Sequence, residues 1–182
     1  MSGRIVTLTS HLREQEHLSA EVRTKFIDLF HDFCHACKAI SHEVNRAGLA
    51  GILGRADVTN ASGDEVQALD LFSHDVLVRG METGGHLCVM GSEECPDAIP
   101  VPEGAPCGDY VLLFDPLDGS SNIDYNVSIG TIFSIIPRQS TGGGPGTIED
   151  CLQPGSAQVA AGYVLYGSST MLILTTGNGV DG

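Results

Sequence analysis

The sequence FDPLDGSSNID at residues 114–124 directly follows the apolar, β-prone run YVLLF at residues 110–114. Such a run predicts a buried strand. Asp115 and Asp118 bring two carboxylates to the end of that strand, and the proline after Asp115 favours an extended backbone there. Carboxylate oxygens at a strand end are the hard ligands that Mg²⁺ prefers.

The segment Gly119-Ser120-Ser121 that follows suits a phosphate group. Its successive backbone N–H groups and two hydroxyls can donate to phosphate oxygens, at the start of a short helix. Together with the two acids, it predicts a magnesium-dependent phosphoryl-transfer site. The alternative is an ordinary turn, because Asp, Pro, Gly, Ser and Asn are also the commonest turn residues. This motif alone supports both interpretations equally.

The composition limits the class of protein. The chain has 182 residues, enough for one core or a core with a small lobe. Its net charge of −14 argues against nucleic acid as a partner, because phosphate contacts need clustered Lys and Arg. No apolar run is long enough to cross a membrane, and the N-terminus lacks the pattern of a secretory signal. We therefore expect a soluble, cytoplasmic protein.

Acidic residues concentrate at residues 57–124, where Arg79 is the only basic residue. Carboxylates that converged there without counter-ions would repel one another. Bound metal ions are one solution, and basic partners elsewhere in the chain are another.

The six cysteines give no clear zinc or disulfide pattern. Cys34 and Cys37 form a C-x-x-C on a strongly periodic helix, and no second C-x-x-C follows. A reduced, packed helix face is favoured over zinc. Cys95, Cys107 and Cys151 lie in loop-like segments, where a redox role stays open.

Two helices are expected in the first half of the chain. A long helix begins at Ser19, because apolar residues then recur every three or four positions. Residues 1–18 are mixed and polar, and predict a mobile N-terminal arm. A second helix is expected from Ser62, where Ser62-x-x-Glu65 matches a capping box, to near Gly80.

The strands are expected at residues 86–91, 110–114, 129–136, 158–166 and 170–175. A Gly-Ser-Ser turn before the last of them predicts a hairpin. Helices followed by grouped strands predict an α+β fold, with N-terminal helices packed on one mostly antiparallel sheet. Residues 19–182 should form one domain.

Four further acids are candidates for the same site. Glu93 and Glu94 follow the expected strand at residues 86–91, so a second strand end carries acids, although a surface loop is the alternative. Asp64 falls in the first turn of the expected helix, where the helix dipole alone favours a carboxylate. Asp70 falls in the middle of that helix, next to apolar residues.

Several segments together resemble class 1 fructose-1,6-bisphosphatase: GSEE at 91–94, FDPLDGSSNID at 114–124, SIGTIFSI at 128–135, LQPG at 152–155 and AAGYVLYGSSTML at 160–172. The similarity runs in order from about residue 20 to the C-terminus. DPLDG alone would indicate only the wider superfamily of metal-dependent sugar and inositol phosphatases. The resemblance implies a layered α-β-α-β-α fold, of which this chain is the first half.

The resemblance also implies a role for each candidate residue. By this resemblance, the site would bind two or three Mg²⁺ ions, with Mn²⁺ as an alternative metal. Their ligands would be Glu93, Glu94, Asp115, Asp118 and the backbone carbonyl of Leu117. It assigns the cleaved phosphate to Asp118, Gly119, Ser120 and Ser121. Glu94, assisted by Asp70 and Asp64, would take the proton of the attacking water.

The implied reaction is hydrolysis of the 1-phosphate of fructose 1,6-bisphosphate to fructose 6-phosphate and phosphate, a step of gluconeogenesis. Sedoheptulose-1,7-bisphosphatase shares the acidic motif and is the alternative enzyme. A non-catalytic regulatory or interaction fragment is the alternative of another class. Because the family's sugar-binding residues would lie beyond Gly182, we expect a truncated site with incomplete activity. The resemblance further implies a homotetramer.

AMP inhibition, known for animal members, is left open by the sequence. Tyr110 of the implied AMP site is retained, whereas Asp109 stands where those enzymes have lysine and Pro137 where they have arginine. Leu53 replaces the aromatic residue that anchors a mobile loop in the vertebrate enzymes, which predicts weaker loop closure.

Overall fold

The computed structural model describes residues 5–46, 55–59, 65–121 and 127–182. Its elements in chain order are α1 (Leu8–Arg13), α2 (Ala20–Val44), β1 (Arg55–Thr59), β2 (Glu65–Gln67), α4 (Ala68–Met81), β3 (Leu87–Ser92), β4 (Ile99–Pro100), β5 (Tyr110–Asp118), β6 (Ile129–Pro137), α5 (Ile148–Cys151), a 3₁₀ turn (Gly155–Ala157), β7 (Ala160–Tyr166) and β8 (Thr170–Thr175).

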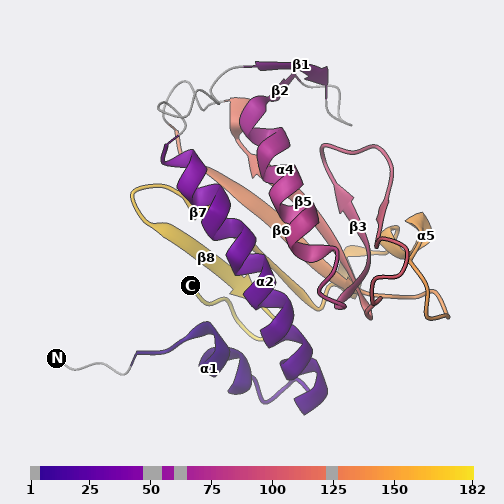
Figure 1. The fold of residues 1–182 in the computed structure, drawn as a ribbon. Helices are drawn as coiled ribbons and strands as arrows, with labels where there is room; N and C mark the ends of the chain where they lie inside the picture. The colour runs from indigo at the N-terminus through magenta and orange to yellow at the C-terminus, as the bar shows by residue number, and fades with distance from the viewer. Residues whose placement is uncertain (1–4, 47–54, 60–64, 122–126) are drawn as a thin grey trace.

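One six-stranded sheet organises the chain, in the order β4-β3-β5-β6-β7-β8. β3 and β5 are parallel, and all other neighbours are antiparallel. Helices α2 and α4 lie beside each other across one face of this sheet (Figure 1). The predicted α+β class, with N-terminal helices on a mostly antiparallel sheet, is confirmed.

The core lies between α2 and the sheet. Ser19 caps the helix by accepting a hydrogen bond from the Val22 N–H, as its sequence predicts. Phe33 on the buried face of α2 places its ring 4.5 Å from that of Phe133 on β6. Burial of each such side chain contributes about 1.5–3 kcal/mol. Cys37 is buried on the same helix, as the predicted packed helix face requires.

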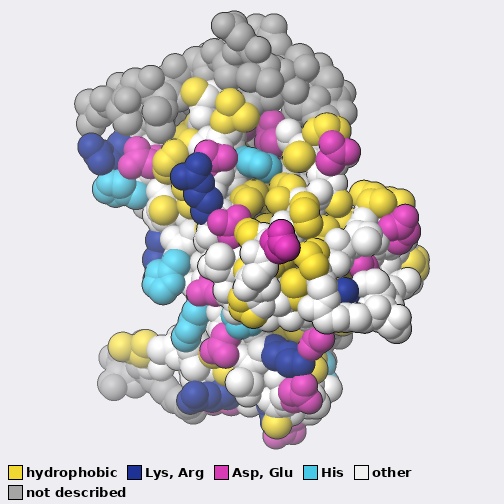
Figure 2. Space-filling model, turned by 45° about the vertical axis from the view of Figure 1, so that its right-hand side comes forward, with side chains coloured by type: hydrophobic (Ala, Val, Ile, Leu, Met, Phe, Trp, Pro, Cys, Tyr) yellow, Lys and Arg dark blue, Asp and Glu magenta, His cyan; other side chains and the backbone are white. Residues whose placement is uncertain are grey.

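The opposite face of the sheet presents apolar side chains to solvent. Its strands alternate, so that one set of residues points to the helices and the other away from them. Those pointing away include Ile132 and Met171, which are 47% and 46% exposed. A space-filling view turned by 45° from that of Figure 1 shows, on another side of the molecule, apolar side chains gathered at the surface with acidic ones around them (Figure 2).

Two expectations about the first third of the chain were wrong. The helix predicted from Ser62 begins only at Ala68, because Glu65–Gln67 forms β2 and pairs with β1. Ser62 itself lies outside the described residues. Cross-strand pairing is a tertiary effect that a capping-box pattern does not reveal. Asp70 consequently lies in the first turn of α4 and not in its middle.

The segment predicted as an N-terminal arm contains a short helix that the sequence analysis did not predict. Thr7 caps α1 through a hydrogen bond from the Ser10 N–H, and Leu12 is fully buried against the core. None of the described helices has both the length and the hydropathy needed to cross a membrane.

Candidate functional site

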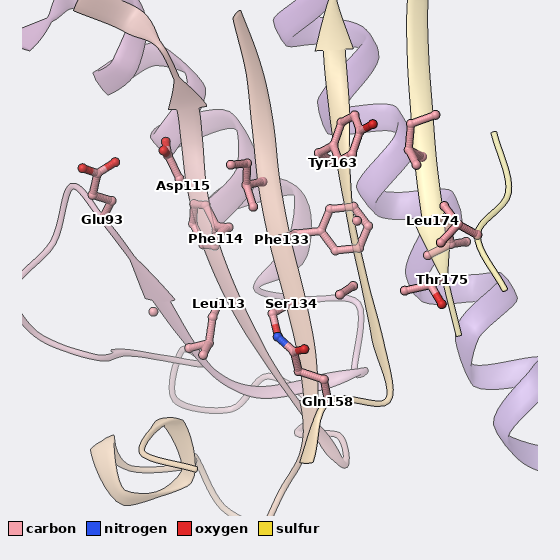
Figure 3. A pocket seen from close by; sticks show the side chains of 16 residues that line it. Glu93, Leu113, Phe114, Asp115, Phe133, Ser134, Gln158, Tyr163, Leu174 and Thr175 are labelled. Carbon is pink, nitrogen blue, oxygen red and sulfur yellow. The ribbon is translucent and has the colours of Figure 1, made fainter. Parts of the chain in front are cut away.

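The ends of β3 and β5 bring acids from two parts of the chain to one edge of the sheet. Because the two strands are parallel, Ser92 at the end of β3 lies beside Phe114. The Glu93 N–H donates to the Phe114 carbonyl at 3.1 Å. Glu93 therefore lies close to Asp115, and both side chains stand at the same end of a groove (Figure 3).

A β-bulge explains why Asp115 and Asp118 lie on the same face of the sheet. In a regular strand, side chains three positions apart point to opposite faces. Here Asp115 pairs with Ile132 and Asp118 with Gly130, so two residues of β5 face the single residue Thr131. The extra residue of the bulge turns both aspartates to the open face of the sheet.

Backbone geometry around the bulge fixes the direction of these acids. The Leu117 N–H donates to Asp115 Oδ1 at 2.9 Å and so orients that carboxylate. Gly119 has φ +82°, in the left-handed region that favours glycine, and the chain turns there. Ser120 and Ser121 then begin a 3₁₀ turn, as the expected short helix start predicts.

Glu94 lies where β3 ends, close to Asp70 at the start of α4. Asp70 is only 2% exposed. Burial, followed by the charges of Asp70 and Glu93, raises the pKa of Glu94 to about 7. Glu94 Oε2 is buried and has no hydrogen-bond partner among the residues that the structure describes.

Asp115 is in a similar environment. Burial and the nearby Glu93 carboxylate raise its pKa, against the lowering effect of the Leu117 N–H. Burial and the charges of neighbouring carboxylates thus act in the same direction on Glu94 and Asp115.

A histidine of α4 supports the turn that carries Glu93 and Glu94. His74 Nδ1 lies 2.8 Å from the Ser92 hydroxyl, which also accepts the Glu94 N–H at 3.3 Å. The His74 ring packs near Phe114 with centroids 6.1 Å apart. The sequence analysis missed this contact, although a histidine inside the apolar run LFSHDVL was a signal for it.

The donors present fit a hard divalent cation such as Mg²⁺. The donors are all oxygen, one buried carboxylate oxygen lacks a partner in the described part of the chain, and neighbouring carboxylates add to the effect of burial in raising the pKa values of Glu94 and Asp115. Among the described residues, no three acidic, histidine or cysteine side chains already form a metal-binding group. Asp64, the remaining predicted acid, lies outside the part of the chain that the structure describes.

The groove that begins at these acids has a volume of about 650 Å³. It runs along the open face of the sheet from Glu93 and Asp115 towards Gln158 (Figure 3). Its wall is mostly apolar, and Tyr163 of β7 lies on one side of it.

Comparison with known proteins identifies the family. The family described as fructose-1-6-bisphosphatase, N-terminal domain, matches residues 6–182. The chain belongs to the fructose-1,6-bisphosphatase family. The fructose-1,6-bisphosphatase class 1 of Chlorobaculum parvum is 51% identical over 180 residues, which cover 99% of this chain and 54% of that protein. The class 1 enzyme of Chloroherpeton thalassium is also 51% identical, with 51% of its length covered.

Solved fructose-1,6-bisphosphatases share the fold. The Leishmania major enzyme in holo form superimposes with a TM-score of 0.86 at 36% identity, covering 98% of this chain and 54% of that one. The apo form gives a TM-score of 0.76 at 33% identity. The resemblance stated from the sequence is confirmed, and the chain spans about half the length of these fructose-1,6-bisphosphatases.

Proposed function

We propose that this chain forms the metal- and phosphate-binding half of a magnesium-dependent fructose-1,6-bisphosphatase, which removes the 1-phosphate of fructose 1,6-bisphosphate. One observation carries the proposal: acids from the ends of β3 and β5 and from the start of α4 lie close together, and neighbouring carboxylates help to raise the pKa values of Glu94 and Asp115. Relatives of about 50% identity bear the name of that enzyme.

Different residues have different roles in the proposed hydrolysis. Glu93, Asp115 and Asp118 present carboxylate oxygens to the cation side of the site, with the Leu117 carbonyl as a neutral oxygen ligand. Bound Mg²⁺ would lower the pKa of a water molecule and neutralise phosphate charge. The Gly119–Ser121 turn would hold the phosphate for in-line attack through its N–H groups and hydroxyls.

Glu94 is suited to receive the proton of the attacking water at Oε2, the oxygen that has no other partner among the described residues. A general base works best when its pKa lies near the working pH, and that of Glu94 is about 7. Asp70 behind it raises this pKa, because a second negative charge favours the protonated form of Glu94. Asp64 stays assigned to the same step by resemblance alone.

Phosphate release from fructose 1,6-bisphosphate by the purified protein tests the proposal. Asp118→Asn should lower kcat on fructose 1,6-bisphosphate by about 100-fold or more, because a charged ligand is lost. Asp97→Asn, an exposed acid in the loop after β3, is the matched control and should leave kcat unchanged. Near-normal turnover by Asp118→Asn would contradict the proposal. Faster turnover of sedoheptulose 1,7-bisphosphate would favour the alternative enzyme.

Other features of the family stay predictions for this chain, namely the homotetramer, Mn²⁺ as a second metal and inhibition by AMP. In the structure, Asp109 next to Tyr110 pairs with Lys25 at 2.5 Å. This ion pair places a carboxylate in the region where the animal enzymes are implied to bind AMP.

A further inference from the structure

A row of buried polar side chains reaches from helix α2 to the acidic bulge. Thr131 on β6 is fully buried, and its hydroxyl donates to the Pro116 carbonyl at 2.9 Å. The Tyr166 hydroxyl lies 2.7 Å from the same Thr131 oxygen. Tyr166 also makes a hydrogen bond with the thiol of Cys37 on α2.

The direction of these hydrogen bonds follows from the number of protons. Thr131 has a single hydroxyl proton, and the Pro116 carbonyl can only accept. Thr131 therefore donates to Pro116, and Tyr166 donates to Thr131. The single hydroxyl proton of Thr131 is therefore used for the bond to the Pro116 carbonyl.

The Pro116 carbonyl needs this donor because of the bulge. Between Asp115 and Asp118 the ladder to β6 is interrupted, since both Pro116 and Leu117 face Thr131. Pro116 is buried, and a buried carbonyl without a donor is costly. The Thr131 side chain donates a hydrogen bond to this carbonyl at the point where the ladder is irregular.

The apolar surroundings of Thr131 indicate that its hydroxyl serves the hydrogen bond to the Pro116 carbonyl. Its neighbours on the buried face of β6 are all apolar, namely Ile129, Phe133 and Ile135. Valine has nearly the shape of threonine and would suit such a core better if no hydrogen bond were needed.

We propose that Thr131 is a positioning residue for the acidic bulge. By fixing the Pro116 carbonyl, it sets the directions in which the flanking acids Asp115 and Asp118 face the cation side of the site. That the bulge binds a cation rests on the function proposed above; that Thr131 holds the bulge in place rests on the hydrogen bonds alone.

Amide hydrogen exchange of the metal-free chain tests the positioning role. The Leu117 N–H, bonded to Asp115 within the bulge, reports whether the bulge opens. Thr131→Val should speed exchange at Leu117 by about tenfold or more relative to the core amide of Phe133. Thr131→Ser keeps the hydroxyl and should stay within about threefold of the wild type. Ile135→Val, on the same buried face of β6 but away from the bulge, is the control and should leave the ratio unchanged.

Magnesium affinity, measured by calorimetry with inorganic phosphate present, is the second readout. Thr131→Val should weaken binding about tenfold, whereas Thr131→Ser and Ile135→Val should match the wild type. An unchanged Leu117 exchange ratio in Thr131→Val, or an equal change in Ile135→Val, would overturn the proposal. If Thr131→Val does not fold, a loosened bulge in Thr131→Ser would overturn it as well. A wild-type chain that binds no Mg²⁺ would count against the proposed function, while the exchange ratios would still decide the role of Thr131.

Discussion

Replacing Asp150 by alanine should destabilise the chain strongly, although Asp150 lies outside the candidate site. Asp150 is 1% exposed and accepts three backbone N–H groups. Its Oδ1 takes those of Gln139 and Ser140 at 3.0 and 2.7 Å, and its Oδ2 takes that of Thr147 at 2.9 Å. These donors lie at the two ends of the glycine-rich loop between β6 and α5.

Two routes bracket the magnitude of this change. Three hydrogen bonds to a charged acceptor, at about 1.5 kcal/mol net each, predict a loss of about 4.5 kcal/mol. Burial alone would raise the pKa of Asp150, but the N–H donors of Thr147, Ser140 and Gln139 outweigh it and lower the pKa to about 2. Against an unfolded value of about 3.9, that difference corresponds to about 2.5 kcal/mol at neutral pH.

The pKa difference also fixes the pH dependence. Because the folded pKa lies below the unfolded one, the stabilisation is complete above about pH 5 and is lost as the pH falls towards the folded pKa of about 2. The gap between the wild type and Asp150→Ala should therefore shrink to about half between pH 7 and pH 3.

Urea unfolding followed by circular dichroism at pH 7, 5 and 3 measures this gap. Glu103→Ala removes an exposed acid and should change the free energy of unfolding by less than about 0.5 kcal/mol. A gap below about 1 kcal/mol at pH 7, or one that stays constant down to pH 3, would refute the reasoning.

Three further outcomes are expected. Phe33→Ala should lower the free energy of unfolding in urea by about 3–5 kcal/mol, because Phe33 is 1% exposed; a loss below about 1 kcal/mol would contradict its packing. Lys25→Met should change that free energy by less than about 0.5 kcal/mol, because its ion pair with Asp109 is exposed; a larger loss would make the pair structural. Cys37 and Cys88 should resist iodoacetamide at pH 8, because burial raises their thiol pKa values to about 12 and about 11; mass spectrometry showing rapid labelling of the folded chain would contradict this.

Much of the fold could be predicted because hydrophobic periodicity records which side of an element is buried. It predicted α2 and the strands β6 and β8 close to their observed bounds, whereas β5 continues four residues beyond its expected end. Periodicity does not record the partner or direction of a strand. The parallel pairing of β3 with β5 therefore emerged only from the structure, and so did the pairing of β2 with β1 that delays the start of α4.

The candidate site could be predicted only as a set of acids. Spacing alone places Asp115 and Asp118 on opposite faces of a regular strand, and only the register with β6 reveals the bulge that brings them together. The supporting contacts of His74 and Thr131 were missed for a related reason. The role of a polar residue in an apolar run can be inferred only when its hydrogen-bond partner is known.

The chain buries carboxylates in two contrasting ways. One stabilises the fold, and the other suits a binding site. Asp150 receives three backbone donors, and its pKa falls to about 2. Glu94 keeps a buried oxygen that has no donor among the described residues, lies near two other carboxylates, and its pKa rises to about 7. A carboxylate that serves only the fold gains from internal donors, whereas one that must bind a cation or a proton has to leave its oxygens open. The second arrangement lowers stability without improving the packing, and this cost is the physical reason for the cation that we propose beside Glu94.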